Sequence, residues 1–297
     1  MAENDRAVTE VHRRLSGLTG EALFAQVEEE QKRIKKAIYD GRGMAVIYVG
    51  VLASTWIDKH VEKWLREKGA ATTLSMSVQH NITSEMGLDL MDVADVVRRH
   101  PDVLDHFADP DPATFLDDLA RLPGADEVTQ ALQRYLDRYG MRCSGEIDIT
   151  RTRFHEDPSA LTPMILADIR AYGPGARNLV FDRGLRAAQD KQQDVLTRLR
   201  RLRGGKRKAE RTRRKIGQLR AFIGYREYPK YLMVQRYWAI KQALLREAER
   251  LVGQGTLREP ADVYHLSLDE FCDAARTGRV DQSLIDRRKK EHAGHVR

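Results

Sequence analysis

Two cations and three aromatic rings lie together in residues 224–231, whose sequence is GYREYPKY. Arg226 and Lys230 flank Pro229, and this pattern predicts a bend at a helix junction. Two cations beside apolar rings could hold an anionic transition state over an aromatic floor that contacts a ligand. The alternative interpretation is packing, because tyrosines at this spacing commonly serve as packing residues.

A second stretch, 139–154, alternates arginines with acids in a glycine-broken sequence. Arg142, Arg151 and Arg153 alternate there with Glu146 and Asp148. Arginine can bind two phosphoryl oxygens at once, so this pattern could face a phosphate. An ion-pair network that fixes an irregular loop is the other interpretation, and the residues themselves leave both open.

A third stretch, 75–88, gathers amide, hydroxyl, imidazole and carboxylate groups around a predicted helix start. The free N–H groups of such a start could bind an anion. A capping network that satisfies those same groups is the alternative.

The rest of the chain must position these three stretches, and its apolar residues recur mostly with a period of 3.6, which predicts helices. No stretch shows sustained alternation of period two, so few or no short strands are expected. We predict an all-α fold with one irregular helical domain. The helices expected from periodicity and caps cover 21–39, 44–66, 83–99, 126–139, 164–172, 185–203, 206–225 and 231–252, and Ser267 to Glu270 fits a capping box.

The positive charge of the chain is concentrated in one segment. The 297 residues carry a net charge of +7, but 198–220 alone holds twelve Lys/Arg and one acid. Such a cluster could bind nucleic acid or an acidic partner. The interpretation we favour over a nucleic-acid partner is a long, protruding, solvated helical hairpin over 185–225 that turns at Gly204-Gly205, since no aromatic residue lies among the charges to stack on bases.

The composition excludes several classes of protein. A hydrophobic fraction of 41% supports a packed core, and two cysteines cannot build a disulfide framework. The longest apolar run, 44–53, is half of the roughly 20 residues that a membrane span needs. We therefore expect a cytoplasmic protein without a membrane partner.

The three stretches together resemble one protein family. S-V-x-x-NITSEMGL from Ser77, RYGMRCSGEIDITRTRF from Arg138 and FIGYREYPKYLMVQRYW from Phe222 resemble rifamycin (rifampin) phosphotransferases, which are often labelled phosphoenolpyruvate-synthase-like. The order and spacing also match, over nearly the whole chain. Gln79-His80 stands where the resemblance leads us to expect Pro-Asn.

The resemblance implies a dikinase-type reaction in which ATP, antibiotic and water give AMP, phosphate and an antibiotic phosphorylated on an ansa-chain hydroxyl. It implies an ATP-grasp domain, a helical antibiotic-binding domain and a mobile phosphohistidine domain, with ATP and Mg²⁺ in the full-length enzyme. The glycine-rich nucleotide segment and the histidine motif are absent from this sequence. We therefore expect 1–285 to be the rifamycin-binding domain, 286–297 to be a tail or linker toward the histidine domain, and the chain alone to hold no cofactor and to be inactive.

The resemblance also suggests roles for single residues. Arg226 and Lys230 match the family's basic pair near the phosphoryl-accepting hydroxyl, where they would act in catalysis. Arg142, Glu146 and Asp148 match a motif of the wider synthase family, which implies an ion-pair or phosphate-facing role.

A rifamycin is large and mostly apolar, so its pocket must be largely hydrophobic. The candidate lining residues come from the most apolar, glycine-punctuated stretch, and core packing is the alternative for each. They are Tyr39, Met44, Val46 and Ile47. A relative with another acceptor, such as pyruvate, would share the fold but need a smaller and more polar pocket.

Overall fold

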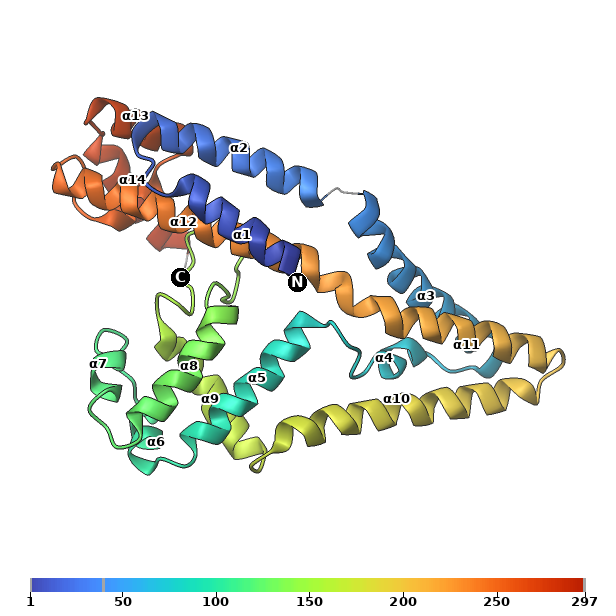
Figure 1. Ribbon diagram of the computed structural model, residues 1–297. Helices are drawn as coiled ribbons and strands as arrows, with labels where there is room; N and C mark the ends of the chain where they lie inside the picture. Colours follow the sequence, from blue (N-terminus) through green and yellow to red (C-terminus); the bar gives the residue numbers. More distant parts are fainter. Residues whose placement is uncertain (1, 39–40, 296–297) are drawn as a thin grey trace. The chain divides into compact units, whose positions relative to one another are not determined.

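The computed structural model describes residues 2–38 and 41–295, and its contacts divide the chain into two compact units (Figure 1). The first unit contains the described residues 2–38, 145–151 and 232–295, and the second contains 41–144 and 152–231. All regular elements in the described part are helices, and no strand occurs there. The predicted all-α fold is therefore confirmed.

In the described residues, the first unit is built from five α-helices and one short 3₁₀ helix. They are α1 (Ala2–Leu15), α2 (Gly20–Ile38), the part of α12 (Tyr228–Gly253) that follows Tyr231, the 3₁₀ helix η3 (Pro260–His265), α13 (Leu268–Thr277) and α14 (Gln282–His295). Two apolar clusters hold it together. In one, α1 and α2 pack on Ala239, Ile240 and Ala243 of α12, and in the other Phe24 of α2 packs edge-on against Phe271 of α13.

The predicted capping box is present at the start of α13. The backbone N–H of Glu270 donates to the Ser267 hydroxyl at 3.2 Å, and the Ser267 N–H donates to the Glu270 carboxylate at 2.7 Å. The two side chains thus satisfy backbone donors that the helix start leaves without a partner.

The second unit holds the remaining helices. They are α3 (Gly41–Leu65), α4 (Ala70–Leu74), α5 (Ile82–Val97), α6 (Pro101–Ala108), α7 (Phe115–Leu119), α8 (Ala125–Tyr139), η1 (Pro158–Leu161), α9 (Thr162–Ala171), α10 (Ala176–Arg200), α11 (Gly205–Phe222), η2 (Ile223–Glu227) and the first turn of α12.

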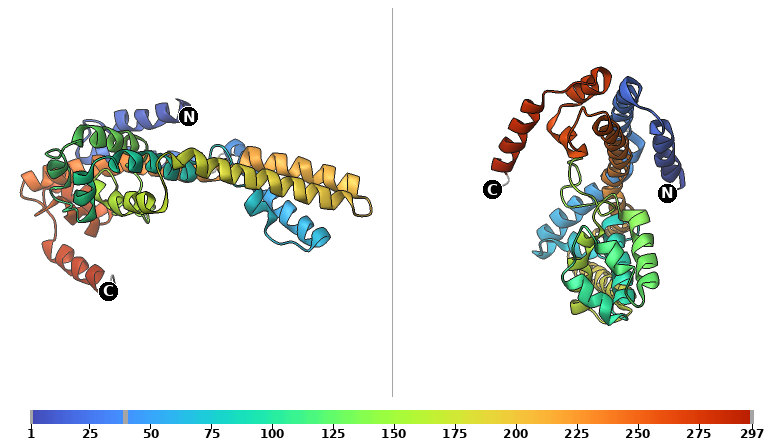
Figure 2. Two further views of the ribbon diagram at one scale, coloured as in Figure 1. Left: turned by 90° about the horizontal axis from the view of Figure 1, so that it is seen from below. Right: turned by 90° about the vertical axis from the view of Figure 1, so that its left-hand side faces the viewer.

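The two basic helices, α10 and α11, run side by side in opposite directions (Figures 1 and 2). Gly204 joins them with a positive φ of 70°, which glycine adopts without strain. Their apolar positions are buried against α3 and α4, with Leu199 and Leu219 fully buried and Ile57 and Val61 opposite them. Their basic positions are largely exposed. The charge cluster is therefore one face of an amphipathic pair whose other face is a core.

Several helix boundaries differ from those expected. α10 begins at Ala176, nine residues before the expected start, and α12 begins at Tyr228 and includes Pro229. Proline fits there because the first turn of a helix does not use its backbone N–H as a donor. α5 ends at Val97, before Pro101, and Pro101 begins the next helix, α6. No helix among the described residues is long and apolar enough to cross a membrane.

Candidate functional site

The loop 75–81 between α4 and α5 is held in an unusual backbone conformation. Ser77 and His80 have positive φ angles of 49° and 63°, a region that side-chain-bearing residues rarely adopt. The Ser77 hydroxyl donates to the carbonyl of Phe181 at 2.7 Å. The Arg220 guanidinium donates to the carbonyl oxygens of residues 74 and 76 at 2.8 and 3.1 Å. Neighbouring helices thus fix the loop from both sides.

Two glycines allow this close approach. A Cβ atom on Gly224 would lie 2.2 Å from the carbonyl oxygen of Gln79, and one on Gly184 would lie 2.3 Å from the Ser77 hydroxyl. Both distances are far shorter than van der Waals contact. The loop can therefore reach η2 and α10 only because neither position carries a side chain.

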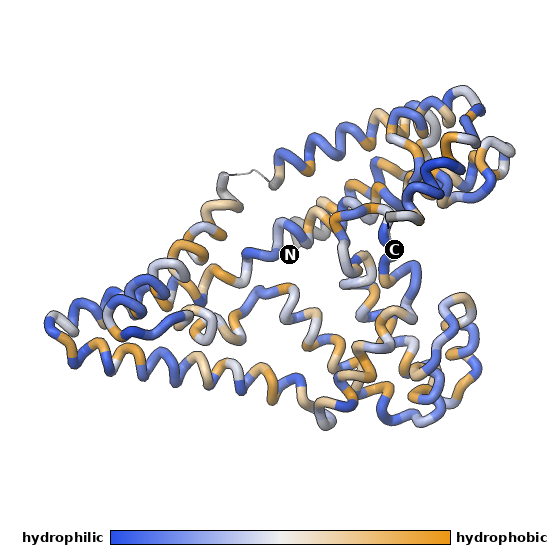
Figure 3. Tube along the Cα trace, turned by 180° about the vertical axis from the view of Figure 1, so that it is seen from behind, coloured by the Kyte–Doolittle hydropathy of each residue, from blue (hydrophilic) through white to orange (hydrophobic). Residues whose placement is uncertain are grey.

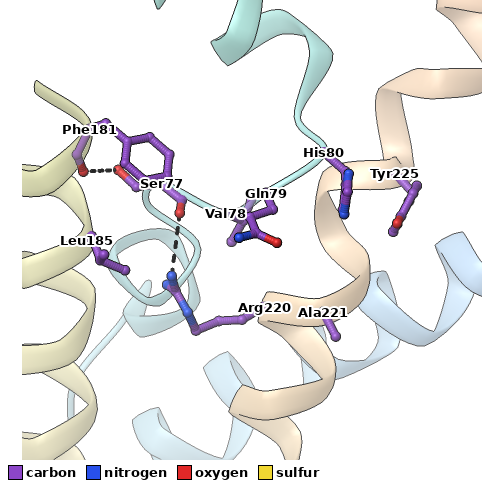
Figure 4. A pocket seen from close by; sticks show the side chains of 9 residues that line it. All are labelled: Ser77, Val78, Gln79, His80, Phe181, Leu185, Arg220, Ala221 and Tyr225. Carbon is purple, nitrogen blue, oxygen red and sulfur yellow. Dashed lines mark hydrogen bonds between the residues drawn. The ribbon is translucent and has the colours of Figure 1, made fainter. Parts of the chain in front are cut away.

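A pocket of about 470 Å³ opens between this loop, α10 and α11 (Figure 4). Its lining consists of Ser77, Val78, Gln79, His80, Phe181, Leu185, Arg220, Ala221 and Tyr225. Aliphatic and aromatic groups form much of the lining, with a few polar groups around them. Burial lowers the pKa of Arg220, whose N–H groups are directed at the loop carbonyls. This composition suits an apolar ligand held by few polar anchors.

A row of aromatic rings leads away from this pocket. The ring of His80 stacks on Tyr225, with centroids 4.8 Å apart and an interplanar angle of 20°. Tyr225 and Tyr228 follow at 5.7 Å, and Tyr228 and Tyr231 at 6.4 Å. The Arg142 guanidinium carbon lies 5.9 Å from the centroid of Tyr231. The row therefore brings together parts of all three stretches that the sequence singled out.

Arg226 and Lys230 lie beside this row, on η2 and in the first turn of α12. Both are exposed, and the Arg226 side chain retains 62% of its accessible surface. Its guanidinium pairs with Glu227 at 2.9 Å. Arg226 directly follows Tyr225, which lines the pocket, so a cation stands at the pocket's margin.

The expected lining residues Met44, Val46 and Ile47 are half-buried in the N-terminal part of α3. A Cβ on Gly50 would lie 2.8 Å from the backbone nitrogen of Ile223, so α3 and η2 touch through their backbones. α3 and α11 run in opposite directions (Figure 1). The turn that precedes Gly50 therefore lies along η2, which carries Arg226. Tyr39 falls outside the described residues.

The residues of the Arg142 motif are divided between the two units. Arg142 is buried in the second unit, whereas Glu146 and Asp148 belong to the first. Glu146 is buried, and Asp148 is half exposed and accepts the backbone N–H and the hydroxyl of Thr150 at 2.9 and 2.8 Å. Asp148 thus shapes its own turn, which supports a structural role for it.

A charged network adjoins the end of the row of rings at Tyr231. Asp89 of α5 accepts from Arg138 at 2.8 Å and from the Tyr139 hydroxyl at 2.7 Å, and it pairs with Arg177 of α10 at 2.7 Å. Burial and Asp89 raise the pKa of Tyr139. The Tyr231 hydroxyl donates to the carbonyl of Arg138 at 2.9 Å, which ties the start of α12 to α8.

Sequence reasoning missed Phe181, Leu185 and Arg220 as pocket residues. The charge pattern groups Arg220 with the solvated cations, and the apolar pattern predicts that the helix carrying Phe181 and Leu185 begins nine residues later than it does. Gly184 was a usable signal, since an isolated glycine in a helical pattern indicates close backbone approach or a special packing role. In the described part, no group of three or more His, Cys, Asp or Glu side chains could hold a metal ion.

The fold and the site define an all-α domain with a partly apolar pocket beside exposed cations. Residues 42–227, which cover nearly all of the second unit together with the segment 145–151 of the first, match the protein family described as the rifampicin phosphotransferase fourth domain, and the chain belongs to this family. The resemblance seen in the sequence is thereby confirmed.

Curated relatives extend the similarity beyond that range. A rifampicin phosphotransferase of a Streptomyces species is 48% identical over 96% of the chain, one of Bacillus cereus is 44% identical over 97%, and one of Bacillus subtilis is 43% identical over 96%. The chain spans about a third of the length of each.

Proposed function

We propose that this chain is the acceptor-binding part of a rifampicin phosphotransferase. In the full-length enzyme, ATP, a rifamycin and water would give AMP, phosphate and the phosphorylated antibiotic, which inactivates it. The observation that carries the proposal is the pocket at 75–81, whose lining residue Tyr225 directly precedes Arg226. The family match and the printed names of the relatives support the choice of acceptor.

The proposed role of Arg226 and Lys230 is electrostatic. When the acceptor hydroxyl attacks phosphorus, a P–O bond forms, the bond to the donor breaks and the hydroxyl proton is released. The transferring phosphoryl group spreads negative charge over its oxygens, and two cations at its side stabilise that charge. Both side chains are exposed, and Arg226 directly follows the pocket residue Tyr225, so a phosphorylated donor could reach them.

The proposed antibiotic contacts combine the pocket with α3. Val78, Phe181 and Leu185 offer an apolar floor, and Met44, Val46 and Ile47 continue it along η2. A cavity of about 470 Å³ takes part of a rifamycin, and the remainder would lie along the ring row. Tyr39 remains a candidate lining residue, and Arg142 contributes at the far end of the row.

We assign ATP, Mg²⁺ and the phosphohistidine carrier to the two thirds of the relatives that this chain does not span. Mg²⁺ would neutralise phosphate charge during the nucleotide reaction. The chain alone would then bind the antibiotic without phosphorylating it.

Calorimetric titration of the chain with rifampicin tests the proposal. We expect saturable binding with a Kd in the micromolar range. Leu185→Trp fills the pocket and should weaken binding about tenfold or more, which corresponds to the loss of about 1.4 kcal/mol. Leu179→Trp is the matched control on the same helix, because Leu179 is 62% exposed and lies outside the pocket lining. Absence of binding at high micromolar rifampicin, or an equal effect of both variants, would refute the proposal.

A dikinase relative with a small acceptor such as pyruvate is the second candidate. A carboxylate of that size needs a small, polar site with free cations, whereas this pocket is larger and its arginine is engaged with loop carbonyls. Saturable binding of pyruvate and none of rifampicin would favour that candidate. A nucleic-acid-binding module is the third candidate function. The apolar faces of α10 and α11 are buried in a core, which favours a pair of helices whose basic faces are simply solvated.

A further inference from the structure

α3 carries a row of large side chains that the proposed site does not use. Tyr48, Leu52, Trp56, His60 and Trp64 follow one another every four residues, so they form a ridge that turns gradually around the helix, from the exposed side at Tyr48 toward the core at Trp64. We call this row the α3 ridge. Tyr48 and Leu52 are 55% and 62% exposed, and the other three are half-buried (Figure 3 colours the helix by hydropathy).

Five cations border the α3 ridge. Two lie on α3 itself and three lie along one side of α11; they are Lys59, Lys63, Lys208, Arg211 and Lys215. The Lys208 ammonium is 5.4 Å from the ring centroid of Trp64, and the Arg211 guanidinium carbon is 5.2 Å from that of Trp56. Within the part of the chain that the structure describes, no carboxylate lies within ion-pair distance of any of the five.

We propose that the α3 ridge docks an acidic amphipathic helix from another domain of the full-length enzyme. The inference rests on the proposed function, because it requires the domains that the chain does not contain. An amphipathic helix lays apolar residues at intervals of three or four on such a ridge, and flanking carboxylates would pair with the cations. From Tyr48 to Trp56 the ridge stays within about 80° of rotation around α3 and is about 12 Å long, which is enough to contact two turns of a partner helix.

The partner helix is expected to come from the same full-length polypeptide. The chain spans only a third of its relatives, so most of a full-length enzyme lies outside it. A partner segment in the same polypeptide has a high effective concentration, so a ridge of this modest size suffices to hold it.

The arrangement of the rings disfavours single-stranded nucleic acid as the partner. Base stacking needs a free ring face. His60 stacks on Trp56 with centroids 4.0 Å apart, and Arg211 lies over the same ring. Lys208 covers Trp64. The uncovered part of the ridge is instead the apolar pair Tyr48 and Leu52, which suits a protein surface.

Hydroxyl-radical footprinting of the full-length enzyme and of the chain alone tests the docking. We expect the oxidation rates of Tyr48, Leu52 and Trp56 to fall about threefold or more in the full-length enzyme, since covering a side chain excludes the radical. Leu179, exposed on α10, serves as the reference residue. Equal rates in both proteins would overturn the proposal.

Two variants of the full-length enzyme sharpen the result. Leu52→Asp removes the apolar anchor, and the double variant Lys59→Glu with Lys63→Glu reverses the charge of one border. Both act on exposed side chains, so we expect folded proteins in which the oxidation rates return to those of the chain alone. Leu179→Asp is the matched control and should leave the protection intact. Protection that persists in both ridge variants would overturn the proposal.

Other occupants have their own signatures. Sedimentation of the chain alone as a dimer that Leu52→Asp dissociates would identify a second copy, and protection of the chain by a 20-nucleotide oligo(dT) would identify nucleic acid; either result overturns the proposal. Calorimetry with rifampicin separates the two inferences. Leu52→Asp should bind rifampicin as the unmodified chain does, so loss of protection with intact rifampicin binding concerns docking alone.

Discussion

Gly224 and Gly184 decide whether the loop 75–81 can reach its place. A Cβ atom on either glycine would lie too close to an oxygen atom of the loop. For Gly224 that oxygen belongs to the backbone, which cannot rotate away as a side chain can. Gln79 and His80, which stand where the resemblance leads us to expect Pro-Asn, lie at this contact. At the residue scale, the pocket therefore requires glycine at positions 184 and 224 as well as the nine residues that line it.

Gly224→Ala should lower both the stability of the chain and its affinity for rifampicin. The added methyl group must displace the loop backbone, which typically costs about 1–3 kcal/mol. Gly217→Ala is the matched control, because it lies inside α11 with no atom near its Cβ position, and it should stabilise the chain by about 0.5–1 kcal/mol. Urea unfolding measures both values. Equal effects of the two variants would contradict the close contact.

Arg226→Gln and Lys230→Gln should separate binding from catalysis in the full-length enzyme. Removing one group that stabilises charge in a transition state lowers kcat about 100-fold or more. Rifampicin affinity should change little, because the proposed antibiotic contacts are mainly apolar. Arg214→Gln is the control, since Arg214 is also exposed but lies on the solvated side of α11. A drop in affinity with unchanged kcat would assign these residues to binding instead.

At the scale of elements, the basic pair α10 and α11 is held by its apolar face. Leu199 is fully buried among α3, α4 and α11, so Leu199→Ala should destabilise the chain by about 2–5 kcal/mol. Arg207 is exposed and makes no ion pair with the described residues, and Arg207→Gln should change stability by less than about 0.5 kcal/mol. Thermal unfolding distinguishes them. Equal losses would mean that the charges, and not the core, hold the pair.

The start of α13 should respond to acid. Arg288, with the backbone N–H of Ser267, lowers the pKa of Glu270 to about 2. The unfolded value is about 4.3, so the carboxylate contributes stability above that pH and loses its contribution as the pH falls toward 2. The difference in unfolding free energy between the chain and Glu270→Gln should therefore be larger at pH 7 than at pH 2.5. A difference that is independent of pH would contradict this capping arrangement.

Sequence periodicity predicts most of these helices but not how they meet. α5, α8 and the body of α12 follow their apolar patterns. The apolar pattern does not predict α1, whose buried residues Val11 and Leu15 pack in a tertiary cluster with α2 and α12. Gly140, which ends α8, has φ near −62° and makes room for the ring of His155, a contact that no periodicity predicts. The pocket escaped prediction for the same reason, since Phe181 and Arg220 meet the loop only through tertiary packing.

At the scale of the whole molecule, the chain consists of two compact units and matches one domain of a larger enzyme. The expected boundaries at 1–285 and 286–297 stay predictions, and residues 286–295 belong to α14. The chain mixed with ATP, Mg²⁺ and rifampicin should yield no phosphorylated antibiotic by mass spectrometry, because nucleotide and carrier functions are assigned to other domains. Turnover by the chain alone would contradict that assignment.

The central claim is that rifampicin binds beside the stacked rings of His80 and Tyr225. Histidine-ring NMR of the chain tests it directly, with the His80 signal assigned by its loss in His80→Gln. Saturating rifampicin should shift the His80 signal, because the ligand alters the ring's surroundings, and should leave His265 and His292 of the first unit unchanged. Saturable rifampicin binding without any shift of the His80 signal would contradict the account.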